Sequence, residues 1–363
     1  MNSAAKIKAV VLIAAAVYWA ACTEQAPETA EVRAPGIADW GAVTETAAYA
    51  RYGLTKLSDY GFFEGDLRDL HPAERVFPYT VASPLFSDYA EKARFVFMPE
   101  GSSAEYHDRD VMEFPEGSVL IKNFSYTAGQ IGADRDVLLE TRLLIHGPEG
   151  WKALPYVWDT DQKEAYLDIA GGAREVTLPG QGTFRYSIPN MQQCKTCHDK
   201  NGKMSPIGPS ARQLHHGTEG LSQLEVWHRK GLLSGYPEGS PPTSAVAYSD
   251  TRHPLDLRAR AYLDANCAYC HRPEGSAKNS GLDLSVFAAS EFALGIGKGP
   301  VAAGRGSGGL RHDIVPGNPD ASIAVYRMES TEPAVMMPEL GRSTVHDEGT
   351  ALIREWIAGL KEG

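Results

Sequence analysis

The pentapeptide CKTCH occupies residues 194–198, and a second one of the same form, CAYCH, occupies residues 267–271. In each, two cysteines two residues apart are followed at once by a histidine. CxxCH is the attachment pattern of c-type haem. Two thiols add to the two vinyl groups of one haem, and the adjacent imidazole becomes the proximal iron ligand. The sequence therefore predicts two covalent haem c groups. The attachment points would be Cys194, Cys197, Cys267 and Cys270. The proximal ligands would be His198 and His271.

Other chemistries of paired CxxC motifs are a four-cysteine zinc site, disulfides and a thioredoxin-like redox pair. A zinc ribbon closes its two pairs over a short loop, whereas a long stretch of chain separates Cys197 from Cys267. An exported chain could oxidise each pair to a short disulfide. None of these chemistries calls for a histidine directly after each pair, and haem attachment does.

The N-terminus predicts export. Lys6 and Lys8 precede an apolar run over residues 9–21, which is shorter than the roughly 20 residues of a membrane-spanning helix and is typical of a secretory signal. Cys22 follows two alanines and resembles a lipoprotein cleavage site, although Trp19 stands where that pattern usually has an aliphatic residue. A plain signal peptide and an uncleaved anchor stay open. We expect a periplasmic protein, anchored as a lipoprotein through Cys22.

Charge and motifs exclude several classes of function. The formal net charge of −11 argues against a binder of nucleic acid or anionic membrane, which would need a basic face. It is compatible with a basic periplasmic redox partner protein. The chain contains no GxSxG, HExxH, Walker or dinucleotide-binding fingerprint.

The expected fold class is α+β, with an antiparallel β-rich, sandwich-like domain followed by α-helical cytochrome c-type haem domains. Seven short runs rich in Val, Ile, Leu, Tyr and Phe are separated by Gly, Pro, Asp and Asn, which is the pattern of successive strands. The runs are ARFVFMP, SVLIKNFSY, DVLLETRLLIHG, KALPYVWD, EAYLDI, REVTLP and TFRYSI. The predicted parts are a signal peptide (1–22), a tether (23–52), the β-rich domain (53–190), a first haem region (191–250) and a second, class-I-like cytochrome c domain (251–363).

The second haem domain has the order of a small cytochrome c. Residues 257–266 predict a helix that leads into CAYCH, and a C-terminal helix follows from an apolar stripe. The stripe is Leu352, Ile353, Trp356, Ile357 and Leu360. Thr344 and Asp347 resemble its capping box. The Gly-rich stretch 295–310 lacks the strand–GxxxxGK[ST]–helix context of a phosphate loop, and we interpret it as a flexible surface loop.

Met337, followed by Pro338, is the expected distal ligand of the second haem, since a Met ligand lies late in such a domain. Met336 and Met328 are its rivals. For the first haem, Pro209 lies in a Gly-Pro segment like the one in small cytochromes c, whose Pro carbonyl orients the proximal histidine. By analogy Pro209 would serve His198. The sixth ligand of the first haem stays open. The candidates are His215, His216, His228, His253, Met204 or an open position.

The β-rich region has polar residues but no nucleophile–base or carboxylate-pair motif. Those considered are Asp88, Tyr89, Glu91, Lys122 and Glu140. We expect them to be ordinary surface and strand-pairing residues, and no catalytic residue is predicted.

The haem motifs and their flanking segments together resemble a family of bacterial diheme c-type cytochromes with a β-rich N-terminal region. The segments are GLTKLSDYGFF, SPLFSDYAEKARFVFMPEG, FPEGSVLIKNFSY, PIGPSARQL, PGNPDASIAVYRM and MMPELG. The resemblance spans residues 53–360 and implies the same four attachment cysteines and the same two proximal histidines. It says little about a substrate.

Two functions follow as expectations. The first is electron transfer by an exported diheme cytochrome. The second is a diheme redox enzyme, peroxidase-like or the cytochrome subunit of a periplasmic oxidoreductase, with an open first haem. Two six-coordinate haems favour the carrier, and one open haem favours the enzyme.

Overall fold

The computed structural model describes residues 53–217, 221–301 and 303–361. The predicted signal peptide, Cys22 and tether lie outside them. All described residues belong to one compact unit. Among them, no helix has the length and apolar character needed to cross a bilayer.

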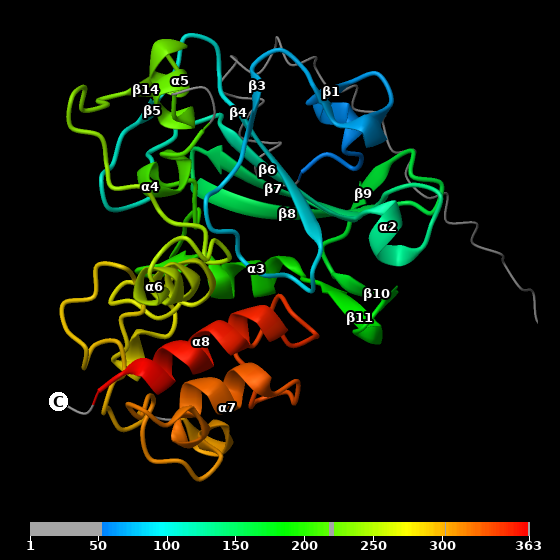
Figure 1. The fold of residues 1–363 in the computed structure, drawn as a ribbon. Helices are drawn as coiled ribbons and strands as arrows, with labels where there is room; N and C mark the ends of the chain where they lie inside the picture. Colours follow the sequence, from blue (N-terminus) through cyan, green and yellow to red (C-terminus); the bar gives the residue numbers. More distant parts are fainter. Residues whose placement is uncertain (1–52, 218–220, 302, 362–363) are drawn as a thin grey trace, which may run out of the picture. The chain divides into compact units, whose positions relative to one another are not determined.

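One antiparallel sheet of six strands organises the first half of the chain (Figure 1). In spatial order its strands are β3 (Val76–Tyr79), β4 (Glu91–Phe97), β6 (Val119–Tyr126), β7 (Val137–Gly147), β8 (Gly150–Trp158) and β9 (Ala165–Leu167). All seven predicted runs form strands. The last two make a separate hairpin, β10 (Gly172–Leu178) and β11 (Gly182–Ile188).

The α+β class is confirmed, and a sandwich-like packing of two sheets occurs only over part of the six-stranded sheet, where the β10–β11 hairpin packs on Phe124 and Tyr126. A sandwich needs a second sheet packed face to face on the first. Here irregular N-terminal chain covers one face of the six-stranded sheet, and the other face is covered by the β10–β11 hairpin and by segments from the helical half.

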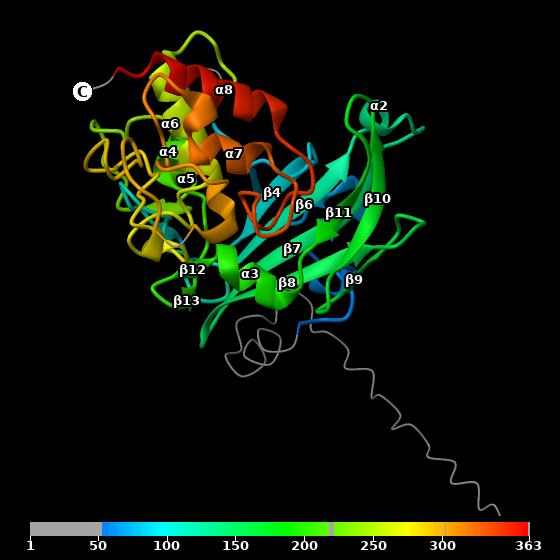
Figure 2. The same cartoon turned by 90° about the horizontal axis from the view of Figure 1, so that it is seen from below.

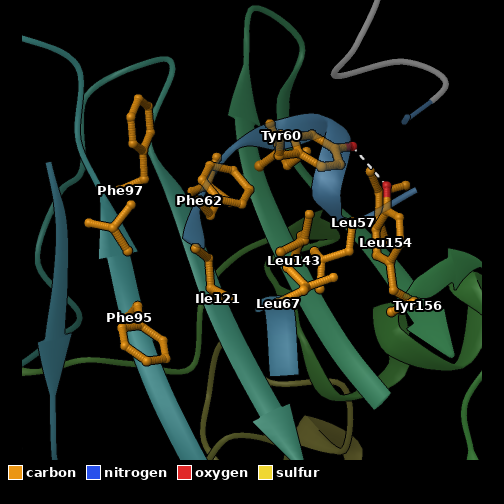
Figure 3. Packing of buried hydrophobic residues seen from close by; sticks show 14 of the residues in the cluster. Leu57, Tyr60, Phe62, Leu67, Phe95, Phe97, Ile121, Leu143, Leu154 and Tyr156 are labelled. Carbon is orange, nitrogen blue, oxygen red and sulfur yellow. Dashed lines mark hydrogen bonds between the residues drawn. The ribbon is translucent and has the colours of Figure 1, made fainter. Parts of the chain in front are cut away.

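Strand alternation explains the first face. Successive side chains on a strand point to opposite sides, so Phe95, Phe97 and Ile121 share a side. They pack with Tyr60 and Phe62 of the N-terminal segment (Figure 3). The hydroxyls of Tyr60 and Tyr156 lie 2.8 Å apart, which satisfies two polar groups that this core buries.

The opposite face receives chain from beyond the first CxxCH motif. Helices α4 (Ala211–Leu214) and α5 (Gln223–Arg229) pack on Val96 and Leu120. Strand β14 (Leu233–Ser234) pairs in parallel with β5 (Ala104–Glu105). The segment after the first motif therefore returns to the β-rich region.

The C-terminal part contains α6 (Leu255–Asn266), α7 (Ile323–Glu329) and α8 (Asp347–Gly359), grouped on one side of the sheet in both views (Figures 1 and 2). Helices α6 and α8 confirm the two predicted helices. The capping box is wrong: α8 begins after His346 with no side-chain cap bond, and the Thr344 hydroxyl donates to Asp88 instead.

The remaining short elements connect these parts. They are β1 (Phe63–Glu64), β2 (His71–Pro72), α2 (Ala128–Ile131), α3 (Met191–Cys197), β12 (Asp199–Lys200), β13 (Lys203–Met204) and 3-10 turns at Ser58–Tyr60, Leu67–Asp69, Lys278–Ser280, Gly304–Ser307 and Pro319–Ala321.

The loop between β3 and β4 joins the two halves of the chain. The buried carboxylate of Asp88 accepts hydrogen bonds from the backbone N–H groups of Ser343 (2.7 Å) and Thr344 (2.8 Å), and from the Thr344 hydroxyl (2.9 Å). Two residues earlier, the Phe86 N–H donates to the side-chain oxygen of Asn266 (2.7 Å). Asn266 directly precedes Cys267, so this loop contacts both the start of the second CxxCH motif and the segment that leads into α8.

Replacing Asp88 with Ala should lower the free energy of unfolding by about 3 kcal/mol, because two buried N–H groups lose their acceptor. Asp88→Asn should cost less, since Asn keeps one acceptor and tolerates the left-handed backbone of this position (φ 49°). Urea unfolding monitored by fluorescence measures both.

Asp59→Ala is the matched control, because that carboxylate is exposed and its loss should change stability by less than about 0.5 kcal/mol. Equal effects of the Asp88 and Asp59 substitutions would contradict the role of Asp88 as a link between the halves.

Candidate functional site

A cavity of about 650 Å³ lies between the sheet and the helical part of the chain. Its wall includes Cys194, Cys197 and His198 of the first motif and Cys267 of the second. Cys270 and His271 are not part of the wall, but their neighbours Tyr269 and Arg272 are. The structure thus brings both CxxCH motifs to one cavity.

The first motif lies on a short helix whose start is encoded locally. The Asn190 side chain accepts from the Gln193 N–H (2.8 Å), and the Gln193 side chain accepts from the Asn190 N–H (2.9 Å). This reciprocal capping box starts α3. Cys194 and Cys197 are three residues apart on the helix, so their thiols lie on neighbouring positions of one face.

His198 has the tautomer that an iron ligand needs. Its Nδ1 lies 2.9 Å from the backbone oxygen of Ser205. A carbonyl can only accept, so Nδ1 carries the proton and Nε2 keeps its lone pair. Burial lowers the pKa of His198 to about 4, and the imidazole is therefore neutral at pH 7.

The prediction that the Pro209 carbonyl orients His198 is wrong. The Pro209 carbonyl accepts from the Met112 N–H (3.3 Å). Strands β12 and β13 turn the chain back directly after the motif, which brings Ser205 rather than Pro209 to the imidazole. Pro209 still lines the cavity.

His271 has the same tautomer as His198, but a side-chain hydroxyl rather than a backbone carbonyl fixes it. Its Nδ1 lies 3.0 Å from the Ser280 hydroxyl, which itself donates to the Ala277 carbonyl (2.8 Å). The hydroxyl therefore accepts from Nδ1, and Nε2 again keeps its lone pair. Burial lowers the pKa of His271 to about 4 as well.

Part of the Gly-rich stretch packs inside the protein, so its interpretation as a surface loop is wrong there. Lys298 is 6% exposed, and its ammonium donates to the carbonyl of Ser280 (2.7 Å) and lies 3.4 Å from the Asp313 carboxylate. The contact with Lys298 fixes Ser280, whose hydroxyl orients His271. The Gly/Lys pattern of the sequence did not predict this contact.

A buried arginine positions the loop that carries Met337. Arg342 is 4% exposed, and its Nε and Nη2 donate to the Met337 carbonyl (3.1 and 2.8 Å). The Met337 N–H donates to the Arg327 carbonyl (3.0 Å). Met337 and Met328 line the cavity, while Met336 does not. Ligation by Met337 stays a prediction.

None of the five named candidates for the sixth ligand of the first haem lines the cavity. His228 bonds the Leu233 carbonyl and the Glu238 carboxylate through its two ring nitrogens. His107 does line the cavity, and the sequence analysis missed it. Its Nδ1 accepts from two backbone N–H groups, so the proton occupies Nε2.

The residues fit haem c, whose iron takes at most two axial side chains. Each CxxCH motif presents two free thiols and a neutral imidazole with Nε2 available. In the part of the chain that the structure describes, no three His, Cys, Asp or Glu side chains form a metal-binding cluster.

His346 makes the stability depend on pH. Its ring is stacked on Phe86 at 4.1 Å and lies 3.1 Å from the Tyr262 hydroxyl. Burial lowers the pKa of His346 to about 4. The Lys92 ammonium lowers this pKa further, whereas the carboxylates of Glu348 and Asp347 raise it. The unfolded chain, with a pKa of about 6.5, takes up the proton first. The stabilising contribution is therefore complete above about pH 6.5 and is lost as the pH falls to 4.

His346→Phe keeps the stacked ring and removes this titration. The loss of unfolding free energy between pH 7 and 4.5 should be smaller in the variant by about 2 kcal/mol. Denaturant unfolding across that range measures it, with the more exposed His253→Gln as control. An unchanged pH slope in His346→Phe would show that the imidazole is not buried neutral.

Comparison with protein families, with curated proteins and with solved structures finds no match for this chain. The cavity and the groups around it are therefore the observations on which a functional proposal rests.

Proposed function

We propose that this chain is an exported diheme c-type cytochrome that transfers electrons between periplasmic redox proteins. The observation that carries the proposal is the meeting of two CxxCH motifs at one cavity, each with a neutral imidazole whose Nε2 is free. Bound haem would supply one-electron chemistry. The chain's residues attach it, orient its ligands and exclude water.

Contacts between the two motifs favour a relay. The Cys270 thiol donates to the carbonyl of Thr196 (3.9 Å), the residue directly before Cys197. The Asn201 N–H donates to the Glu274 carbonyl (2.8 Å). Thioether links made at Cys197 and Cys270 would therefore lie side by side, which suits electron passage from one haem to the other.

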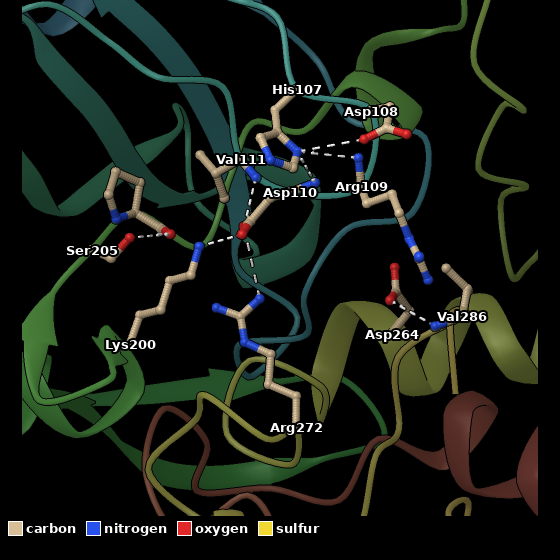
Figure 4. A network of polar contacts seen from close by, with 11 residues as sticks. His107, Asp108, Arg109, Asp110, Val111, Lys200, Ser205, Asp264, Arg272 and Val286 are labelled. Atoms are coloured by element: carbon tan, nitrogen blue, oxygen red, sulfur yellow. Dashed lines mark hydrogen bonds and ion pairs between the residues drawn. The ribbon is translucent and has the colours of Figure 1, made fainter. Parts of the chain in front are cut away.

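Asp110 fixes this juxtaposition from the β-rich side (Figure 4). Its carboxylate forms an ion pair with Lys200, two residues after His198, and lies 3.9 Å from Arg272, the residue after His271. Burial alone would raise the pKa of Asp110, but these cations and the Val111 N–H bring it below its usual value. The ionised carboxylate thus bridges the segments that follow the two motifs.

A second function, a redox enzyme with an open first haem, is favoured by one observation. No predicted His or Met candidate for the sixth ligand of that haem lines the cavity. Carbon monoxide added to the reduced protein tests this: binding at one haem, together with steady reduction of peroxide, would replace the carrier by the enzyme. A carrier shows no peroxide turnover.

Localisation and partner follow from the same proposal. The predicted secretory signal and Cys22 support a periplasmic lipoprotein, and the net charge of −11 suits a basic partner. Association with that partner should weaken as salt rises.

Met337→Ala should lower the reduction potential of one haem and leave the other unchanged, because loss of a thioether ligand removes its stabilisation of the reduced iron. Spectroelectrochemical titration of the two haems measures this. Met336→Ala is the matched control, and it should leave both potentials unchanged. An unaltered pair of potentials in Met337→Ala would rule out this ligand.

Asp110→Asn should weaken the coupling between the haems, because the bridge between Lys200 and Arg272 is lost. Interacting haems in the wild type should give a split, two-signed circular dichroism signal in the Soret band, and the variant should give a smaller one. Asp108→Asn, at an exposed neighbouring position, is the control. A wild-type protein with two haems and no split signal would contradict the side-by-side arrangement.

A further inference from the structure

Three cationic side chains form a row across the sheet. Arg94 on β4 pairs with Lys122 on β6, and Lys122 pairs with Arg142 on β7. Cross-strand partners project from the same face of a sheet. All three line the cavity that the two motifs share, so this face presents the row to the predicted haem site.

Only one of the three cations has a carboxylate partner. Arg142 binds Glu140 through two bonds, Nε to Oε2 at 2.8 Å and Nη2 to Oε1 at 2.5 Å. Glu140 is fully buried and also accepts from the Tyr186 hydroxyl (2.7 Å). The charge of Arg142 is thereby balanced.

Among the residues that the structure describes, Arg94 and Lys122 have no ion-pair partner of this kind. The Nη1 of Arg94 donates to the Lys92 carbonyl (3.2 Å). The Lys122 ammonium lies 4.9 Å from the centre of the Phe124 ring, and no carboxylate of the described residues forms an ion pair with it. Two other carboxylates that line the cavity are engaged elsewhere: Asp110 with Lys200, and Asp264 with the Val286 N–H and Arg212. The exposed Glu91 acts on Arg94, and Glu140 on Lys122, only through longer-range attraction without an ion pair.

Two unpaired cations on adjacent strands repel each other and lose hydration inside the protein. Such a pair is stable when an anion lies between or beside the charges. Two negative charges supplied by a ligand of the cavity would balance the row.

We propose that Arg94 and Lys122 bind the two propionate carboxylates of the haem attached at Cys194 and Cys197. This inference rests on the proposed function. It gives the β-rich region a role in that function, because side chains of its sheet would bind a haem.

The position of α3 supports the choice of this haem. Helix α3 packs against β8, the strand beyond Arg142, so the attachment cysteines lie at the Arg142 end of the row. Successive strands are about 4.8 Å apart, and the row runs from there to Arg94. A haem carries its propionates on the edge opposite the vinyl-derived thioethers, which directs them away from Arg142. Two propionates also match two unpaired cations in charge.

The test uses Lys122→Met and Arg94→Leu in the mature holoprotein, with the exposed Lys163→Met as control. Each cavity variant should lower the reduction potential of one haem and shift the propionate bending band of that haem in the resonance Raman spectrum. The second haem, and a haem count of two by mass, should be unchanged. Lys122→Arg and Arg94→Lys keep the charge and should resemble the wild type, which covers the case that an uncharged variant fails to mature.

Three outcomes would overturn the assignment. Unchanged potential and band in both variants would show that the row does not contact propionates. A new high-spin signal in Lys122→Met, with no effect of Arg94→Leu, would identify Lys122 as an iron ligand. Binding of added sulfate that Arg94→Leu abolishes, with the propionate band unmoved, would identify a site for a free oxyanion. A wild-type mass without haem would refute the proposed function itself. Because this mass is measured before any variant is made, the two kinds of failure are distinguished.

Discussion

The carboxylate of Asp88 is the contact on which the arrangement of this protein depends. It is 1% exposed and accepts three hydrogen bonds from Ser343 and Thr344, at the start of the chain that leads into α8. Phe86 in the same loop is bonded to Asn266 and stacked on His346. A buried charge is retained only when its acceptor capacity is filled. The loop between β3 and β4 therefore has one favourable position, against the helices that carry the second motif, and the shared cavity lies between the surfaces that it joins.

Each imidazole of the two motifs is held neutral and in one orientation by a single acceptor on its Nδ1. The acceptors differ: a backbone carbonyl for His198 and a serine hydroxyl for His271. Half-buried cations act on them, Lys122 and Arg142 on His198 and Arg327 on His271. Arg342 fixes the Met337 loop through backbone carbonyls. A positive environment of low polarity favours anionic cofactors and raises the cost of leaving them out. The proposed diheme cytochrome accounts for the thiols, the imidazoles and the unpaired cations together.

Local patterns in the sequence predicted local structure well. All seven runs of β-branched and aromatic residues became strands, because alternation and flanking turn residues are encoded within a few positions. Helices α6 and α8 followed from their apolar periodicity. The failures depend on contacts that no local residue pattern encodes. Thr344 resembled a helix cap, yet its hydroxyl bonds Asp88. Pro209 matched a known spacing, but a two-strand hairpin brought Ser205 to His198 first. Lys122 was expected to be an ordinary surface residue, but the register of strands β4, β6 and β7 places it between Arg94 and Arg142.

The intact mass of the denatured protein, exported from cells that mature c-type haem, tests the central claim most directly. The account predicts a chain that retains two haems through denaturation. Cys194→Ser/Cys197→Ser and Cys267→Ser/Cys270→Ser should each retain one. A wild-type chain without covalent haem, carrying zinc or disulfides at these cysteines, would contradict the proposed cofactor and with it the electron-transfer function.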